Sequence, residues 1–106
     1  MIDVTDEQLA MIQAILKRQV PDAEVRLFGS RADGSARRHS DLDLIVVGNA
    51  KCDRGTMNRL CEAFEDSDLP FRVEILDWHR LSESFRDTIG GNYTVLQRPQ
   101  NEETRD

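Results

Sequence analysis

The sequence predicts an α/β (α+β) domain built on a small mixed β-sheet with helices packed on it. Segments with apolar residues at helical spacing alternate with short apolar or β-branched runs that are typical of strands. The predicted order is helix, strand, strand, helix, strand, helix. A helix joins the second and third strands, so we expect these two strands to be parallel with a right-handed crossover. A loop joins the first two strands, which leaves an antiparallel pairing open to them.

The first predicted helix covers residues 5–21. Thr5 and Gln8 have the spacing of a capping box, and Pro21 marks the end of the helix. Its apolar stripe consists of Leu9, Ile12, Ile15 and Leu16. A strand over residues 23–29 follows, with Val25 and Leu27 on one face.

The remaining elements follow a charged loop. A second strand over residues 41–48 ends in a continuous apolar run, which is typical of a strand covered on both faces. A helix begins at about Thr56, and a third strand lies within residues 69–78. The last amphipathic helix lies within residues 79–91 and is stopped by two glycines.

Length and composition favour a single globular domain. The chain has 106 residues, of which 39% are hydrophobic and 32% are charged. We expect one domain over residues 1–97 and a disordered polar tail over residues 98–106. The net charge of −6 argues against a protein that coats nucleic acid, so we expect no direct nucleic-acid binding.

Sequence features that direct a chain to a membrane or a secretory route are not found. No apolar run approaches the ~20 residues that span a bilayer, and residues 1–10 do not resemble a signal peptide. Cys52 and Cys61 are too few for a disulfide framework or a zinc site, and we expect free thiols. The expectation is a cytoplasmic protein with no membrane partner.

Asp41 and Asp43 stand two residues apart in the second predicted strand. Alternate residues of a strand point to the same face, so both carboxylates project together while Leu42 and Leu44 enter the core. Like charges this close repel, and a divalent cation relieves the repulsion. Two such carboxylates can hold one Mg²⁺ or bridge two, and a pair of metal ions suits in-line phosphoryl or nucleotidyl transfer. The alternative is that the aspartates only solvate an exposed strand face.

Gly29 and Ser30 directly follow the first predicted strand. Glycine lets a backbone approach a phosphate closely, and the serine hydroxyl and the next amides can donate to phosphate oxygens. A short helix that begins there would assist. A simple strand-ending turn would explain Gly29 but not the combination with Asp41 and Asp43. The pattern therefore predicts a phosphate-binding turn beside a metal-binding strand.

The segment from Leu27 to Leu44, LFGSRADGSARRHSDLDL, resembles a family signature. The superfamily related to DNA polymerase β has GS, a spacer and DxD, and the minimal nucleotidyltransferases have a pattern close to GSRARGxARxxSDxDL. The matching residues are Gly29, Ser30, Arg31, Ala32, Gly34, Ala36, Arg37, Ser40, Asp41, Asp43 and Leu44. Asp33 stands where the family usually has a basic residue, and Arg38 and His39 occupy variable positions. The resemblance implies the polymerase β-like nucleotidyltransferase fold.

The resemblance also implies a third carboxylate from a later strand, at the position of Glu74. Val73 and Ile75 mark the core-facing side of that strand, so Glu74 lies on the opposite face with Leu76. Asp77, on the Val73 side at the end of the strand, is the alternative. The implied role is a metal ligand or a general base that deprotonates an incoming hydroxyl.

Arg31 and Arg37 are the candidate phosphate-binding cations, because guanidinium groups match phosphate oxygens well. The alternative is pairing within the loop with Asp33 or Asp41. Both arrangements can hold, one in the free protein and the other in the nucleotide complex.

The activity implied by the resemblance is Mg²⁺-dependent nucleotidyl transfer from ATP, with two metal sites possible. Gly29 and Ser30 would bind the phosphates, and Asp41 and Asp43 would hold the metal. Minimal nucleotidyltransferases are commonly antitoxins, which implies AMP transfer to a tyrosine of a HEPN-domain ribonuclease toxin within a hetero-oligomer. Two alternatives stay open: transfer to a small molecule such as an aminoglycoside, and a non-catalytic antitoxin that blocks its partner sterically.

Overall fold

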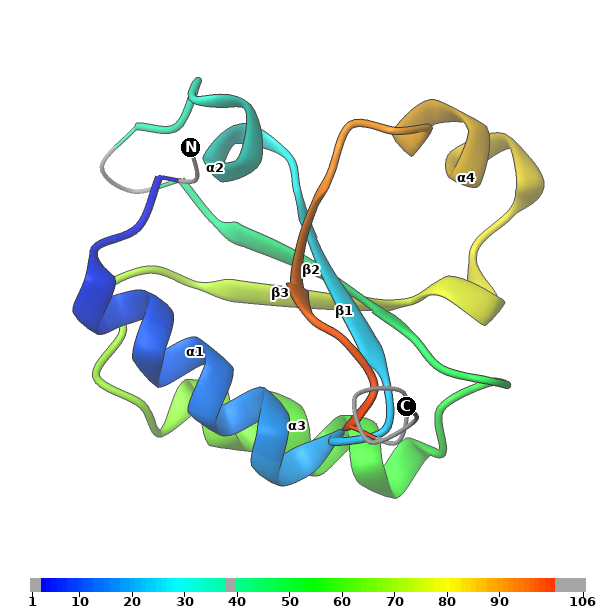
Figure 1. Cartoon of the computed structure of the whole chain (residues 1–106), viewed down its shortest axis with the longest axis horizontal. Helices are drawn as coiled ribbons and strands as arrows, with labels where there is room; N and C mark the ends of the chain where they lie inside the picture. The colour runs from blue at the N-terminus through cyan, green and yellow to red at the C-terminus, as the bar shows by residue number, and fades with distance from the viewer. Residues whose placement is uncertain (1–2, 38–39, 101–106) are drawn as a thin grey trace.

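A computed structural model describes residues 3–37 and 40–100. Its centre is a mixed sheet of four strands in the order β3-β2-β1-β4 (Figure 1). The strands are β1 (Glu24–Phe28), β2 (Leu42–Val47), β3 (Val73–Asp77) and β4 (Thr94–Gln97). β1 is antiparallel to both β2 and β4, whereas β2 and β3 are parallel. The predicted mixed sheet and its parallel pair are confirmed.

Two helices cover one face of the sheet. α1 (Asp6–Gln19) begins with the predicted capping box, in which Thr5 and Gln8 exchange hydrogen bonds, and α3 (Arg54–Glu65) is capped by Asp53. Both helices lie on the same side of the strands (Figure 1). The core between them and the sheet includes Ile12, Leu16, Val25, Leu27, Leu42, Leu44, Val46, Leu60, Phe64 and Leu96. Burial of these apolar side chains is the main stabilisation of the fold.

The other helices are short and lie away from α1 and α3 (Figure 1). α2 (Ser30–Asp33) follows β1 directly, as the motif predicts. The last predicted helix is divided into a 3₁₀ turn, η1 (Trp78–Arg80), and α4 (Glu83–Ile89). The division occurs at Ser82, whose hydroxyl caps α4 by accepting from the Phe85 amide.

Strand β4 is the element that the sequence interpretation missed. It contains one buried residue, Leu96, and joins the sheet through backbone pairing with β1. A strand of four residues with one buried side chain has almost no periodicity to detect. In the predicted tail, the backbone N–H of Gln100 donates to the Pro21 carbonyl at 2.8 Å. Residues 101–106 lie outside the described residues.

Two further expectations concern the cysteines and membrane-spanning helices. Cys52 and Cys61 are free thiols, as predicted, and burial is the main cause that raises the pKa of each thiol. Among residues 3–37 and 40–100, no helix has the length and apolar character needed to cross a membrane.

Candidate active site

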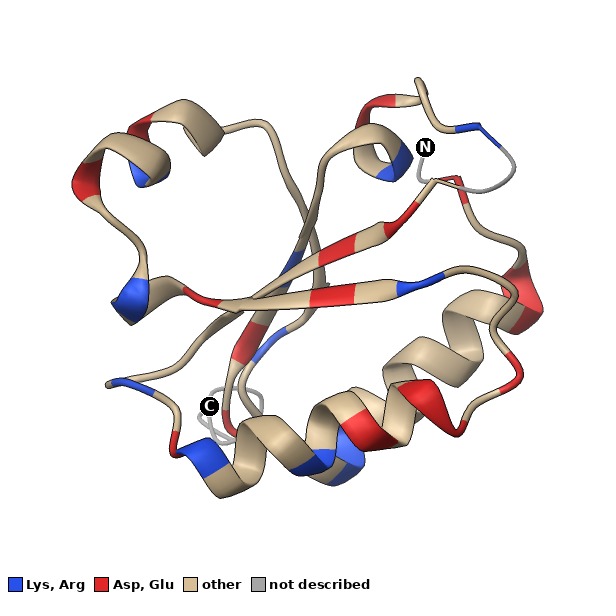
Figure 2. Ribbon diagram, turned by 180° about the vertical axis from the view of Figure 1, so that it is seen from behind, with Lys and Arg blue, Asp and Glu red and all other residues tan. Residues whose placement is uncertain are grey.

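Three neighbouring strands bring the candidate residues into one row. Phe28 at the end of β1 is paired with Asp43 of β2, and Asp43 is paired with Glu74 of β3. Residues directly opposite each other in a sheet project to the same face, so the Asp43 and Glu74 carboxylates share the face opposite α1 and α3. Figure 2 shows the acidic positions of the two strands side by side.

The carboxylates in this row carry unbalanced negative charge. Burial, then Glu74, then Asp41 raises the pKa of the Asp43 carboxyl above its usual range. Within the described part of the chain, Asp41, Asp43 and Glu74 form no salt bridge and accept no side-chain hydrogen bond. A cation placed here would relieve the repulsion.

Gly29 is the residue that lets the turn approach Asp43. Its φ of +79° lies in a region that other residues rarely adopt, and an added Cβ would lie 2.5 Å from Asp43 Oδ2. Any side chain at position 29 would therefore fill the space between the turn and the carboxylate. The turn continues into α2, where the Ala32 and Asp33 amides donate to the Gly29 carbonyl.

The donor set at this site fits Mg²⁺. The candidate ligands are carboxylate oxygens, and Mg²⁺ in nucleotide enzymes is commonly held by one or two carboxylates together with substrate phosphates and water. Among the residues described, no group of three or more side chains forms a complete metal cluster by itself. The arrangement therefore suits an ion whose coordination is completed by a nucleotide, and the predicted ligands are Asp41, Asp43 and Glu74.

Arg31, predicted to bind phosphate, is buried and donates hydrogen bonds to backbone carbonyls. It is 6% exposed. Its Nε and Nη2 donate to the Ser40 carbonyl at 3.0 and 2.8 Å, and its Nη1 donates to the Asp3 carbonyl at 3.0 Å. Its guanidinium also lies 4.0 Å from the centre of the Phe71 ring. Arg31 thus connects the start of the chain to the end of the motif loop, and its contact with phosphate stays a prediction.

The other predicted loop residues are more open. Arg37 is exposed, and its backbone amide donates to the Ser40 hydroxyl at 2.8 Å, so its side chain remains a candidate for phosphate. Asp33 Oδ1 accepts from the Ser35 amide and hydroxyl, and this lowers the pKa of Asp33. Residues 38 and 39 lie outside the described residues.

Asp77, the alternative third carboxylate, lies apart from Asp43. It is paired with Val46, three positions further along β2, and is 4% exposed. Its Oδ2 accepts from the Cys52 amide at 2.6 Å, and its Oδ1 accepts from the His79 amide at 3.1 Å. Asp77 therefore holds the loop after β2, and Glu74 is the carboxylate that the register places beside Asp43.

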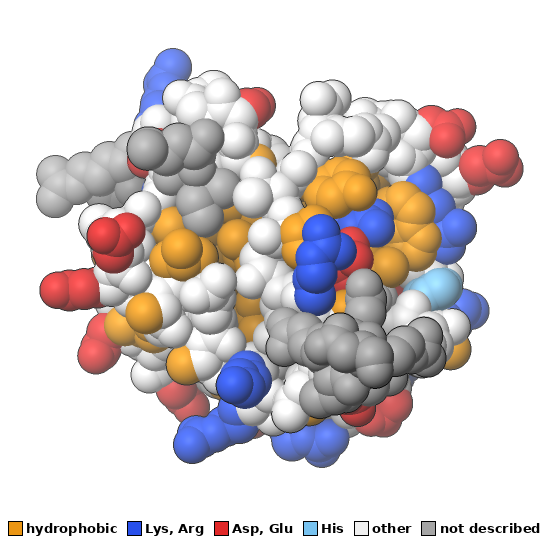
Figure 3. Space-filling model, in the orientation of Figure 1, with side chains coloured by type: hydrophobic (Ala, Val, Ile, Leu, Met, Phe, Trp, Pro, Cys, Tyr) orange, Lys and Arg blue, Asp and Glu red, His pale blue; other side chains and the backbone are white. Residues whose placement is uncertain are grey.

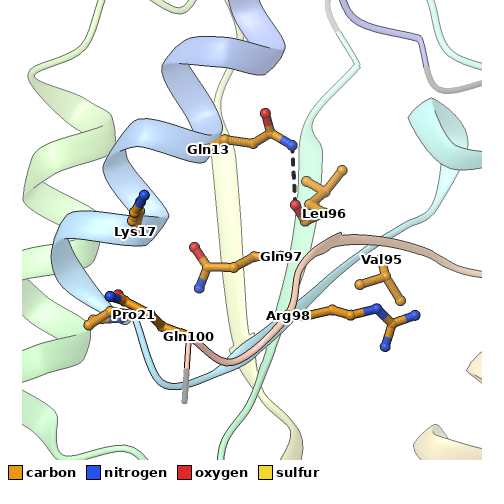
Figure 4. A pocket seen from close by; sticks show the side chains of 8 residues that line it. All are labelled: Gln13, Lys17, Pro21, Val95, Leu96, Gln97, Arg98 and Gln100. Atoms are coloured by element: carbon orange, nitrogen blue, oxygen red, sulfur yellow. Dashed lines mark hydrogen bonds between the residues drawn. The ribbon is translucent and has the colours of Figure 1, made fainter. Parts of the chain in front are cut away.

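Two cavities were not foreseen from the sequence. One, of about 670 Å³, lies between α2 and α4 and includes Gly29, Phe85 and Asn92 in its wall. The other, of about 400 Å³, lies between α1 and β4 and contains none of the predicted site residues (Figure 4). It is lined by Gln13, Lys17, Pro21, Val95, Leu96, Gln97, Arg98 and Gln100.

Comparison with known proteins identifies the family of the chain. Residues 9–95 match the family described as nucleotidyltransferase domain. The chain is 46% identical over 96 residues to the probable protein adenylyltransferase MntA of Haemophilus influenzae, which covers 91% of this chain and 84% of the relative.

Solved structures share the fold. A toxin-antitoxin structure with AMP-PNP has a TM-score of 0.72 and 23% identity, covering 90% of this chain and 77% of the other. A tri-AMPylated Shewanella oneidensis HEPN toxin in complex with MNT antitoxin has a TM-score of 0.61 and 20% identity, covering 92% and 75%. With the family match over most of its length and the sequence identity to MntA, the chain belongs to the nucleotidyltransferase domain family, among its minimal nucleotidyltransferases.

Proposed function

We propose that this chain is a Mg²⁺-dependent protein adenylyltransferase that transfers AMP from ATP to a tyrosine of a HEPN-domain ribonuclease toxin and so neutralises it. The observation that carries the proposal is the row formed by the Gly29 turn, Asp43 and Glu74 on neighbouring strands. The name of the Haemophilus influenzae relative supports a protein acceptor, and the Shewanella oneidensis complex supports a HEPN toxin as partner.

Each residue of this row has a separate role in the proposed reaction. Adjacent strands lie about 4.8 Å apart, so about two such spacings separate the β1 end from Glu74. Gly29 and Ser30 bind the phosphates at one end, and Glu74 receives the acceptor at the other. Asp43, between them, holds Mg²⁺ together with Asp41. When bound, Mg²⁺ supplies the positive charge that stabilises the reacting phosphate oxygens.

The transfer step follows from these positions. The acceptor tyrosine oxygen forms a bond to the α-phosphorus, and the bond from that phosphorus to the oxygen leading to the β-phosphate breaks. Pyrophosphate leaves with the bonding electrons, and the phenolic proton passes to Glu74, whose side chain is exposed and open to an acceptor. Most of the rate enhancement comes from positioning the two reactants.

The acceptor would be held by the partner, so the active unit is a hetero-oligomer of antitoxin and toxin. Because its substrate ATP is a cytoplasmic metabolite, we place the reaction in the cytoplasm.

The test is to incubate the protein with ATP, Mg²⁺ and its HEPN partner and to weigh the partner by mass spectrometry. We expect a gain of one or more AMP units, which the double variant Asp41→Asn/Asp43→Asn abolishes. Inhibition of the toxin by that double variant without a mass gain would replace the proposal by steric neutralisation. AMP transfer to an aminoglycoside but not to the partner would replace it by small-molecule modification.

A further inference from the structure

We propose that the cavity between α2 and α4 holds the adenosine of the donor nucleotide, with Phe85 stacked on the base and Asn92 selecting adenine over guanine. The proposal rests on the proposed function, because it identifies the occupant as the nucleoside of ATP.

The cavity is continuous with the phosphate-binding turn. Its volume of about 670 Å³ is within the range of small-molecule sites. Gly29, Ala32 and Asp33 form its wall on the α2 side, and Phe85 and Thr88 form its wall on the α4 side. Figure 3 shows the surface dipping between the two lobes at the top of the view, where Figure 1 places α2 and α4. A nucleotide with its phosphates at Gly29 would have its nucleoside in this cavity.

Phe85 offers a stacking surface. Its side chain is 41% exposed, the largest exposure of any large hydrophobic residue in the described part of the chain. Its ring meets that of Phe28 edge-on, with centroids 6.5 Å apart and planes at 80°. This contact holds the Phe85 ring beside the end of β1, while 41% of the residue stays exposed. Aromatic rings of this kind stack well on nucleobases, whose faces are flat and polarisable.

Asn92 offers a donor beside an acceptor. Its backbone amide donates to the Ile89 carbonyl at 3.0 Å, and the next residue, Tyr93, stacks on the Arg26 guanidinium at 4.3 Å. The Asn92 side chain is exposed in the cavity wall, and no other described residue forms a hydrogen bond with its amide. An amide matches adenine, which has a donor N6 beside the acceptor N7, and mismatches guanine, which has two acceptors there.

Arg26 holds this wall against the sheet. Its guanidinium lies between the Tyr93 ring and the Trp78 ring, 5.4 Å away, and its Nε contacts the Glu24 carboxylate. The Arg86 side chain of α4 donates to the Trp78 carbonyl at 2.8 Å. Figure 3 shows hydrophobic side chains gathered around basic and acidic ones below α4. The positions of α4 and Asn92 are therefore set before a nucleotide binds, which limits the entropy lost on binding.

The first test measures binding of ATP and of inorganic tripolyphosphate to Phe85 variants by calorimetry, each with Mg²⁺. We expect Phe85→Ala to weaken ATP binding by roughly tenfold or more, because a stacked base is lost. Tripolyphosphate affinity should not change, and Phe85→Tyr should keep wild-type ATP affinity. Because Phe85 is exposed, the alanine variant should remain folded. If the alanine variant does not fold, the tyrosine variant still shows whether an aromatic ring at this position is enough for ATP binding.

The second test measures selectivity at position 92. Asn92→Asp replaces the amide by a carboxylate, which accepts from the N–H groups of guanine. We expect the ratio of ATP affinity to GTP affinity to fall by roughly tenfold. Asn58→Asp, an equal charge change at an exposed position of α3, should leave that ratio unchanged.

These measurements separate the inference from the proposed function, because they record nucleotide affinity and not transfer. Unchanged ATP affinity and selectivity in Phe85→Ala and Asn92→Asp would overturn the nucleoside site. Weaker toxin binding in the same variants would then assign the cavity to the partner. Nucleotide effects as expected, without AMP transfer to any HEPN protein, would overturn only the proposed function.

Discussion

Arg31→Lys is expected to destabilise the fold more than it weakens nucleotide binding. The guanidinium donates to the Ser40 carbonyl through two nitrogens and to the Asp3 carbonyl through a third, and it packs on the Phe71 ring. A lysine ammonium keeps the charge but cannot span the two carbonyls in the same plane. The substitution therefore removes the planar set of hydrogen bonds and keeps the positive charge. It distinguishes a role of Arg31 in stabilising the fold from a role in attracting phosphate.

The magnitude follows from the bonds that lysine cannot make. We expect at least two of the charge-assisted hydrogen bonds that the guanidinium donates to be lost, each with a net value of about 1.5–3 kcal/mol. The free energy of unfolding should then fall by about 3 kcal/mol or more. Small domains have total stabilities of about 5–15 kcal/mol, so the loss is a large fraction of the whole.

Urea unfolding and ATP calorimetry decide between the two roles. For Arg31→Lys we expect a clear fall in the midpoint of unfolding, whereas Arg37→Lys, at an exposed position of the same loop, should leave the midpoint unchanged. If Arg31→Lys unfolds at the wild-type urea concentration but binds ATP at least tenfold more weakly, the reasoning is refuted. Arg31 would then be a phosphate ligand.

Further substitutions test the rest of the site. Gly29→Ala should cost about 1–3 kcal/mol in strained backbone and abolish AMP transfer, whereas Gly48→Ala should cost little; urea unfolding and transfer assays compare the two. Asp43→Asn should raise Tm at neutral pH, because the raised pKa of Asp43 makes its charged form unfavourable in the fold. That gain should vanish as the pH falls through the raised pKa, which thermal unfolding at neutral and acidic pH measures. Asp77→Asn should lower stability by about 1–3 kcal/mol and spare ATP binding; transfer lost at full stability would instead favour Asp77 over Glu74 as the third carboxylate.

The parts of the site that were predictable from the sequence are those set by local rules. The alternation of a strand places Asp43 on the face opposite Leu42 and Leu44, and the same rule places Glu74 opposite Val73 and Ile75. Asp41, which we predicted within the strand, lies one residue before β2 begins at Leu42. Glu74 and Asp43 become neighbours because β2 and β3 are parallel, which the intervening helix predicted. The first step needs only a few consecutive residues, and the second needs only the order of strand, helix and strand along the chain.

The parts that were not predictable depend on partners distant in the chain. The contacts of Arg31 with Asp3 and Phe71 join segments that no periodicity relates. Asp77 is separated from Glu74 by the register of β3 on β2 and by its bond to the Cys52 amide, 25 residues away. β4 is a strand because β1 offers it a backbone edge, and its own four residues carry little signal.

The position of β4, which the sequence interpretation missed, also explains why selectivity for the nucleotide base would depend on residues outside the Gly29–Asp43 motif. β4 returns to the sheet beside β1, so the chain before it must cross above the end of β1, where Phe28 leads into Gly29. That crossing segment carries Asn92 and is joined to α4 through Gly90, whose φ is +51°. The choice of base would depend on a loop that only the complete sheet brings next to the motif residues.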